Sequence, residues 1–353
     1  MKQDSECTTD SLPSQVISFL RFPLIVGIVL IHTSVDTALC EAHSIYTAVL
    51  YVCQQVLSGV AVPLFFIFSG YLLFNKTTAY TTQVYLAKLK SRCRTLLVPY
   101  VVWNMIAVGV YNLSASGMVC CVEDFIRAFW NLRVEDGGGT TTPAYPILVP
   151  FWYVRDLMVL VLLSPIAYWC TKKFSYWWLL LLGILWISGV SCPISGLSLT
   201  GVFFFSLGAY SSIHKKNVVA VLTRYTLLVA AVFLGVVVLE PFMQDTLWIS
   251  WQHIRILVGV LLALSCVARM IETGVWRMPT FLSDSSFFIF ASHIFILSVV
   301  GRLLSRIIPQ NSEANLILCY FLLALLTVLI GIVGYHTLKK CLPKITALLT
   351  GGR

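Results

Sequence analysis

Charge is scarce in this chain of 353 residues. Only 11% of the residues are charged, and 58% are hydrophobic. A soluble globular domain carries about 25% charged residues. The sequence also lacks a long polar stretch that would form a separate soluble domain. These absences exclude an ordinary soluble enzyme and predict an all-α polytopic membrane protein.

Common catalytic and metal-binding signatures are also missing. The eleven cysteines show no C-x-x-C spacing, so the sequence indicates no zinc or redox motif. It contains no P-loop, GxGxxG, HExxH or GxSxG motif. We therefore expect no bound metal, and any catalytic site has to be found from polar residues inside the apolar segments.

Ten apolar segments of helical length follow one another along the chain. They cover residues 16–35, 46–74, 96–112, 148–169, 175–192, 198–213, 218–239, 247–270, 285–306 and 315–338. We predict one bundle of about ten transmembrane helices over residues 16–338, flanked by a cytoplasmic tail at 1–15 and another at 339–353.

The distribution of charge predicts the orientation of the bundle. Basic residues gather in alternate connections and at the C-terminus: Lys76, Lys88, Lys90, Arg92, Arg94, Lys172, Lys173, Lys215, Lys216, Lys339, Lys340 and Lys344. The opposite connections hold most of the acidic residues. By the positive-inside rule both termini are cytoplasmic, in a multi-pass protein of the inner (cytoplasmic) membrane. The same rule explains the net charge of +9 without a nucleic-acid partner.

The first apolar segment carries two ionisable residues, Arg21 and His32. Their spacing of eleven positions corresponds to about 16 Å along an α-helix. Asp36 follows His32 by four positions, so the two side chains share one helix face. An ionisable residue inside a membrane helix is costly and suggests a function. The alternative is that Arg21 is a cytoplasmic anchor and His32 a residue of the opposite interface.

Two further segments carry ionisable groups at a similar predicted depth. Trp152, Arg155 and Asp156 begin the segment at 148–169, while His253 and Arg255 lie near the start of the segment at 247–270. We expect these groups to line a shared cavity that opens outward. The alternative is a structural network of ion pairs.

Two other features also have two readings. His293 lies between apolar residues near the middle of its segment, where an interhelical hydrogen bond is the commoner role. The basic run from Lys88 to Arg94 precedes the segment at 96–112. It is either a topological anchor or a dock for the phosphates of a cytoplasmic cofactor.

Taken together, these motifs resemble the membrane-bound acyltransferase 3 family over residues 18–338. The resemblance rests on Arg21-x10-His32, on VPLFFIFSGYLLF at 62–74 with Ser69 and Gly70, on KLKSRCRTLLVPYVVWN at 88–104, on FWYVRDL at 151–157, and on SSFFIFASHIFIL at 285–297. One departure is Arg92-Cys93-Arg94, an R-x-R where some members of the family have R-x-x-R.

The resemblance implies an integral membrane O-acyltransferase. Such an enzyme moves an acetyl or other short acyl group from cytoplasmic acyl-CoA to a hydroxyl of an extracytoplasmic glycan or lipid-linked glycan. Membrane lipid and this acceptor are the expected partners. A hydroxyl needs a positioned base, and neutral imidazole is suited to that task. His32 is therefore expected to be the base or a transient acyl carrier, with Asp36 beside it.

The remaining expected contacts fall into two sets. Cofactor binding is assigned to Arg21, Lys90, Arg92 and Arg94, and substrate binding to Trp152, Arg155, Asp156, His253, Arg255, Ser69 and His293. The alternative function is a transporter or flippase of a small polar or lipid-linked substrate, which has no need for a base or for a nucleotide dock.

Overall fold

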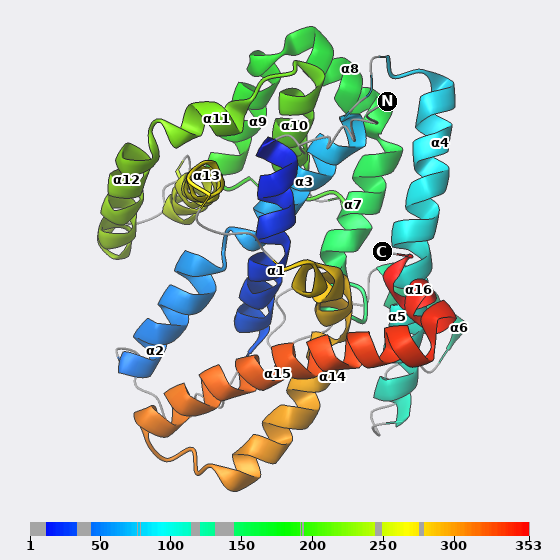
Figure 1. Cartoon of the computed structure of the whole chain (residues 1–353), viewed down its shortest axis with the longest axis vertical. Helices are drawn as coiled ribbons and strands as arrows, with labels where there is room; N and C mark the ends of the chain where they lie inside the picture. Colours follow the sequence, from blue (N-terminus) through cyan, green and yellow to red (C-terminus); the bar gives the residue numbers. More distant parts are fainter. Residues whose placement is uncertain are drawn as a thin grey trace, which may run out of the picture.

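The computed structural model is built from α-helices (Figure 1). It describes residues 12–33, 44–75, 77, 79–113, 121–130, 145–190, 192, 194–243, 249–274 and 279–352, and these contain no β-strand. The all-α class predicted from the apolar runs is confirmed. Asp36 lies outside the described residues.

Sixteen α-helices and four short π or 3₁₀ turns are described. In chain order they are α1 (Leu12–His32), α2 (Ile45–Leu50), η1 (Tyr51–Leu57), α3 (Ala61–Phe74), α4 (Thr82–Arg92), η2 (Cys93–Leu97), α5 (Val98–Leu113), α6 (Val122–Trp130), η3 (Val149–Phe151), α7 (Trp152–Leu162), α8 (Ser164–Phe174), α9 (Tyr176–Ile187), α10 (Leu199–Ile213), α11 (Val218–Thr223), α12 (Thr226–Leu239), η4 (Glu240–Phe242), α13 (Trp251–Glu272), α14 (Thr280–Ile307), α15 (Glu313–Cys341) and α16 (Pro343–Thr350).

Among the described residues, 6 helical stretches are long and apolar enough to cross a membrane. They are α1, the runs Ile45–Phe74 and Thr82–Leu113, and helices α13, α14 and α15. Helices α7 and α8, bent by 68°, form a candidate for a seventh crossing. Three of the ten predicted segments are shorter apolar helices, at α9, α10 and α12 with η4. The protein is thus a multi-pass membrane protein, while ten crossings and cytoplasmic termini remain predictions.

Two segments expected outside the bundle are helical. Helix α4 occupies much of the predicted connection at 75–95 and continues through η2 into α5. Its sequence TQVYLAKLKSR has no glycine or proline and many good helix formers, and the Thr81 hydroxyl caps its first turn by accepting from the Val84 N–H. The segment 339–353, expected as a tail, holds the end of α15 and helix α16, which packs against α5.

Helices α3 and α10 cross at very short range, and two glycines permit this. A Cβ atom added to Gly70 would lie 2.1 Å from the carbonyl oxygen of Phe205, and one added to Gly208 would lie 2.0 Å from that of Ile67. Each glycine therefore faces the backbone of the other helix. The crossing fixes α3, which carries Ser69, against the centre of the bundle.

Helix α1 runs through the middle of the view in Figure 1 and packs against α3, α13, α14 and α15. Its C-terminal carbonyls, which have no partner within the helix, receive side chains from two other elements. The Tyr320 hydroxyl donates to the Leu30 carbonyl at 3.1 Å, and the Gln54 amide donates to the Thr33 carbonyl at 3.0 Å. These bonds hold the end of α1, where His32 lies, in a fixed position.

Candidate active site

His32 is the last residue of α1 and is half-buried. The turn that carries it is closed by Thr33, whose backbone N–H and hydroxyl both donate to the Val29 carbonyl at 2.9 and 2.8 Å. The His32 ring is thus reachable while its backbone is fixed. This combination suits a general base, which needs both access to a substrate and a set position.

His293 on α14 faces His32. The two ring centroids lie 5.3 Å apart, with the ring planes at 45°. His293 is completely buried, and its Nδ1–H donates to the Phe290 carbonyl of its own helix at 2.5 Å. Its Nε2 has no hydrogen-bond partner among the described residues. The hydrogen bond of His293 is therefore within its own helix, while its ring lies against the ring of His32 on another helix.

A row of contacts leads from His293 toward α3 and α4. Its ring lies 6.1 Å from that of Phe290, which lies 6.3 Å from that of Tyr153. The Tyr153 hydroxyl is 3.2 Å from the Ser69 hydroxyl, and α7, which carries Tyr153, packs against α4, which carries Arg92. The predicted residues Ser69, His293 and His32 are thereby linked through two aromatic side chains, Tyr153 and Phe290.

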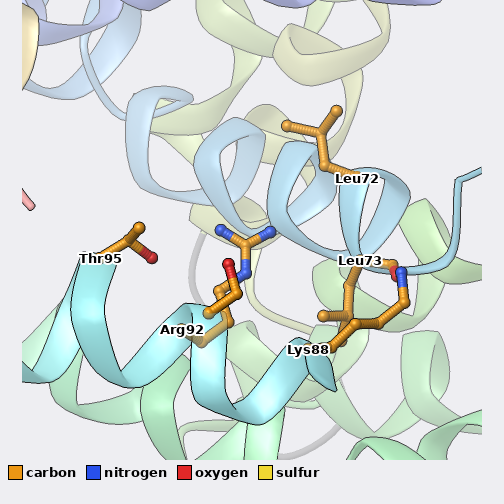
Figure 2. Close-up of a pocket in the computed structure, with 6 residues that line it drawn as sticks. Leu72, Leu73, Lys88, Arg92 and Thr95 are labelled. Carbon is orange, nitrogen blue, oxygen red and sulfur yellow. The ribbon is translucent and has the colours of Figure 1, made fainter. Parts of the chain in front are cut away.

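Arg92 opens onto a basic pocket between the end of α3 and helix α4 (Figure 2). The pocket has a volume of about 280 Å³ and is lined by Leu72, Leu73, Lys88, Ser91, Arg92 and Thr95. The Lys88 ammonium donates to the Leu73 carbonyl, and the Arg92 guanidinium points toward α3. Lys90 and Arg94 are exposed and are not among these lining residues.

Arg21 lies elsewhere on the molecule. Its side chain is exposed on α1 and is attracted by the carboxylate of Asp284 at the start of α14. Asp284 in turn pairs with Lys339 at 3.4 Å, and the Ser283 hydroxyl donates to the Ser18 carbonyl. The structure places Arg21 in a cluster of exposed charges where α1, α14 and α15 meet.

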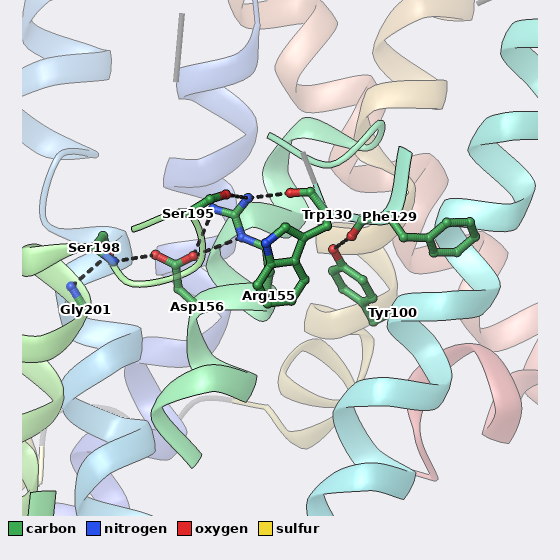
Figure 3. A network of polar contacts seen from close by, with 8 residues as sticks. All are labelled: Tyr100, Phe129, Trp130, Arg155, Asp156, Ser195, Ser198 and Gly201. Atoms are coloured by element: carbon green, nitrogen blue, oxygen red, sulfur yellow. Dashed lines mark hydrogen bonds and ion pairs between the residues drawn. The ribbon is translucent and has the colours of Figure 1, made fainter. Parts of the chain in front are cut away.

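Arg155 and Asp156 form a buried network, shown in Figure 3. Both side chains are almost completely buried, at 4% and 1% exposure, and pair with each other at 3.0 Å. The Arg155 guanidinium also donates to the Trp130 carbonyl at 2.7 Å, and Asp156 accepts from the backbone N–H of Ser198 at 3.0 Å. Since the Ser198 hydroxyl caps α10, the pair ties α7 to α6 and α10. This arrangement matches the structural alternative.

Arg255 lies in a second buried network. It pairs with Glu240 of η4 and donates to the Gln55 carbonyl of η1, and the Tyr51 hydroxyl donates to Glu240 at 2.9 Å. This network joins α13 to η1 and η4, which both precede it in the chain. Glu240 is a partner that the sequence did not indicate.

His253 and Trp152 contact aromatic rings. His253 stacks on Trp186 at 4.3 Å between centroids, and Trp152 lies 6.4 Å from Phe66. In the part of the chain that the structure describes, no contact joins the ionisable groups of α1, α7 and α13. A shared outward cavity therefore stays a prediction.

Tyr153 was missed as a candidate, and Lys88, although part of the predicted basic run, was left out of the assigned cofactor contacts. Positions 88, 92 and 95 share one face of a helix, since they are four and three residues apart. If α4 had been predicted as a helix, its periodicity would have placed Lys88 and Arg92 on one face and Lys90 and Arg94 on other faces. Tyr153 belongs to the motif FWYVRDL but carries no charge, so a search for ionisable groups passes over it.

Comparisons with known proteins agree with this architecture. The model of the family Acyl_transf_3, described as an acyltransferase domain, matches residues 15–336. The succinoglycan biosynthesis protein ExoH of Rhizobium meliloti (strain 1021) is 26% identical over 363 residues, covering 98% of this chain and 94% of that protein. No solved structure matches the chain. A family match over nearly the whole sequence, on a multi-pass helical bundle, shows that the chain belongs to the acyltransferase 3 family and is an acyltransferase.

Proposed function

We propose that the chain transfers a short acyl group, such as acetyl, from cytoplasmic acyl-CoA to a hydroxyl of an extracytoplasmic glycan or lipid-linked glycan. One observation carries the proposal: a row of side-chain contacts runs from the facing histidines through Phe290 and Tyr153 to Ser69 of α3, and the end of α3 borders the basic pocket. A donor held at the pocket and an acceptor at His32 would meet inside the bundle. The cell membrane is the expected location.

His32 is the general base of the proposed reaction. One of its ring nitrogens removes the proton of the acceptor hydroxyl as the oxygen attacks the thioester carbonyl. The new C–O bond forms, the tetrahedral intermediate collapses, and the C–S bond breaks. The departing thiolate takes the proton back from His32, so the products are the ester and free coenzyme A. In the alternative mechanism, His32 first accepts the acyl group from the thioester and then passes it to the attacking hydroxyl.

The pocket at α4 is proposed to hold the phosphates of the donor. These phosphates are anionic, and the pocket presents the ammonium of Lys88 and the guanidinium of Arg92. Guanidinium binds phosphate with two parallel hydrogen bonds. A volume of about 280 Å³ is suited to the charged part of a donor, with the acyl arm extending toward Tyr153. Arg21, Lys90 and Arg94 remain further proposed contacts at the cytoplasmic end.

The nature of the acceptor is inferred from the relative. Its name places ExoH in succinoglycan biosynthesis, and succinoglycan is a polysaccharide. A glycan hydroxyl is therefore the acceptor proposed for this chain, whose alignment with ExoH covers 98% of its length. Such a substrate is consistent with an enzyme whose His32 lies at the C-terminal end of α1, while Arg21 lies near the middle of that helix.

Binding of acetyl-CoA to the purified protein in detergent tests this proposal. We expect saturable binding of radiolabelled acetyl-CoA. Replacing Arg92 or Lys88 with alanine should weaken it about tenfold or more, because a charge-assisted hydrogen bond is worth about 1.5–3 kcal/mol. Lys90→Ala and Arg94→Ala should lose less, because their side chains are exposed.

Lys340→Ala is the matched control, since Lys340 is an exposed cation at the end of α15. It should bind acetyl-CoA as the unaltered chain does. A chain that binds no acetyl-CoA would contradict acetyl-CoA as the donor. If all five variants bind acetyl-CoA equally well, the pocket is not the binding site of the donor phosphates.

A further inference from the structure

We propose that His293 is a positioning residue for His32, accepting a hydrogen bond at Nε2 from an N–H of the His32 ring. This inference rests on the proposed function, in which His32 is the base. The bond would leave the other nitrogen of His32 as the one with a lone pair, directed at the acceptor hydroxyl. His293 would thus do for His32 what a carboxylate does for the histidine of a catalytic triad.

The local structure of α14 determines the tautomer of His293. Its Nδ1 lies 2.5 Å from the Phe290 carbonyl, which can only accept a hydrogen bond, so Nδ1 carries the hydrogen. In the neutral ring, Nε2 then bears a lone pair and can only accept. The ring cannot turn to exchange these roles without breaking the bond to Phe290. His293 therefore presents a fixed acceptor.

That acceptor is buried and unused among the described residues. His293 is 0% exposed, and its Nε2 has no partner there. A buried polar atom without a partner is destabilising, because it has lost its hydrogen bonds to water and gained none in the protein. Such a cost is commonly found where the atom acts in function. Nε2 of His293 therefore needs a donor that binds it in the working state.

His32 is the donor that the geometry supplies. Within the described part of the chain, its ring is the one from another helix that lies against His293 and carries an N–H, at 5.3 Å between centroids. Since His32 is half-buried, its ring has room to turn about its side-chain bonds while α1 stays fixed. A modest rotation would bring a ring nitrogen within the usual hydrogen-bond distance of about 3 Å from Nε2.

Burial argues against His293 as the base itself. The acceptor hydroxyl would have to reach a side chain with no exposed surface. A proton taken up there would create a charge in the bundle interior, and no carboxylate acts on His293 in the described part of the chain. Accepting a hydrogen bond creates no such charge, whereas His32 is accessible and can take the proton.

The test compares two amides at position 293, because each mimics one nitrogen of the ring. In His293→Asn the amide reaches the place of Nδ1 and can still donate to Phe290, but nothing replaces Nε2. In His293→Gln the amide oxygen reaches the place of Nε2. Transfer is measured with radiolabelled acetyl-CoA and native membranes that contain the acceptor but lack the unaltered chain.

We expect His293→Asn to lower kcat about 10- to 100-fold, the scale of a small misplacement of a catalytic group, with KM for acetyl-CoA unchanged. His293→Gln should recover most of that loss. In a His32→Ala background, His293→Asn should cause no further loss, because it acts through His32. Thermal unfolding of each purified variant shows whether a loss of kcat is accompanied by a loss of stability.

The opposite pattern overturns the inference. Recovery by Asn and not by Gln would mean that the bond to Phe290 matters and Nε2 does not. A wild-type kcat in both His293 variants would also rule out the positioning role. So would a further loss of kcat when His293→Asn is combined with His32→Ala. If His32→Ala is itself fully active, the proposed function fails first. If His32→Ala is inactive and the His293 variants are active, only the present inference fails.

Discussion

Replacing His32 with alanine is expected to abolish acyl transfer while the protein remains folded. A positioned general base contributes about 10²–10⁴-fold to a rate, and alanine has no group that can replace the imidazole. The fold should survive because the end of α1 is held by backbone carbonyls, which accept from Gln54 and Tyr320 and do not involve the imidazole.

The measurement is incorporation of label from radioactive acetyl-CoA into the glycan fraction of native membranes. His336→Ala is the control, because His336 bonds to the Phe281 carbonyl away from the proposed site. It should keep normal activity. Asp36→Asn should do less damage than His32→Ala, since it leaves the imidazole of His32 in place. Near-normal turnover by folded His32→Ala protein would end the assignment of the base.

The second large effect concerns the crossing of α3 and α10. A methyl group at position 208 would lie 2.0 Å from the Ile67 carbonyl oxygen and 2.8 Å from the Tyr71 backbone nitrogen. Neither atom belongs to a flexible side chain, so the two helices must separate. Overpacking of this kind costs about 1–3 kcal/mol and occasionally more, and two rigid backbones place Gly208→Ala at the upper end of that range. Loss of the folded protein is the expected result.

Two other helical glycines provide the comparison. A Cβ atom on Gly109 of α5 or Gly235 of α12 would meet nothing within 4 Å. Gly109→Ala and Gly235→Ala should be neutral or stabilising by up to about 1 kcal/mol, because alanine favours helix. The fraction of monodisperse protein and its thermal midpoint in detergent distinguish the three variants. A Gly208→Ala protein as stable as these two would show that the close crossing does not hold the bundle together.

The fold class could be predicted because it depends on local sequence. Apolar runs of helical length and scarce charge are sufficient for an all-α membrane protein. Every predicted segment overlaps a helix. The lengths of α9, α10 and α12 were harder to predict, because an apolar run does not show where the chain turns. Helix α4 was missed because charge was read as a sign of a connection, although lysine and arginine are good helix formers.

Relations between site residues on one helix could be predicted from the sequence, but contacts between residues far apart in the chain could not. Arg21 and His32 share one helix, so their relation follows from their spacing. His32 and His293 belong to α1 and α14, and only packing shows that their rings lie 5.3 Å apart. The ionic residues illustrate the same point. Arg155 and Asp156 are adjacent in the sequence, but their bonds to the backbone groups of Trp130 and Ser198 depend on packing between distant segments.

Mass spectrometry of surface glycans tests the proposed acyl transfer most directly, since it detects the product whichever glycan is the acceptor. Glycans are compared from cells with the unaltered chain, with His32→Ala, and without the chain. We predict a mass increment of one short acyl group, removable by mild base, in the first sample alone. Its mass identifies the acyl group. Identical spectra from all three samples, or an increment that persists with His32→Ala, would contradict acyl transfer by this site.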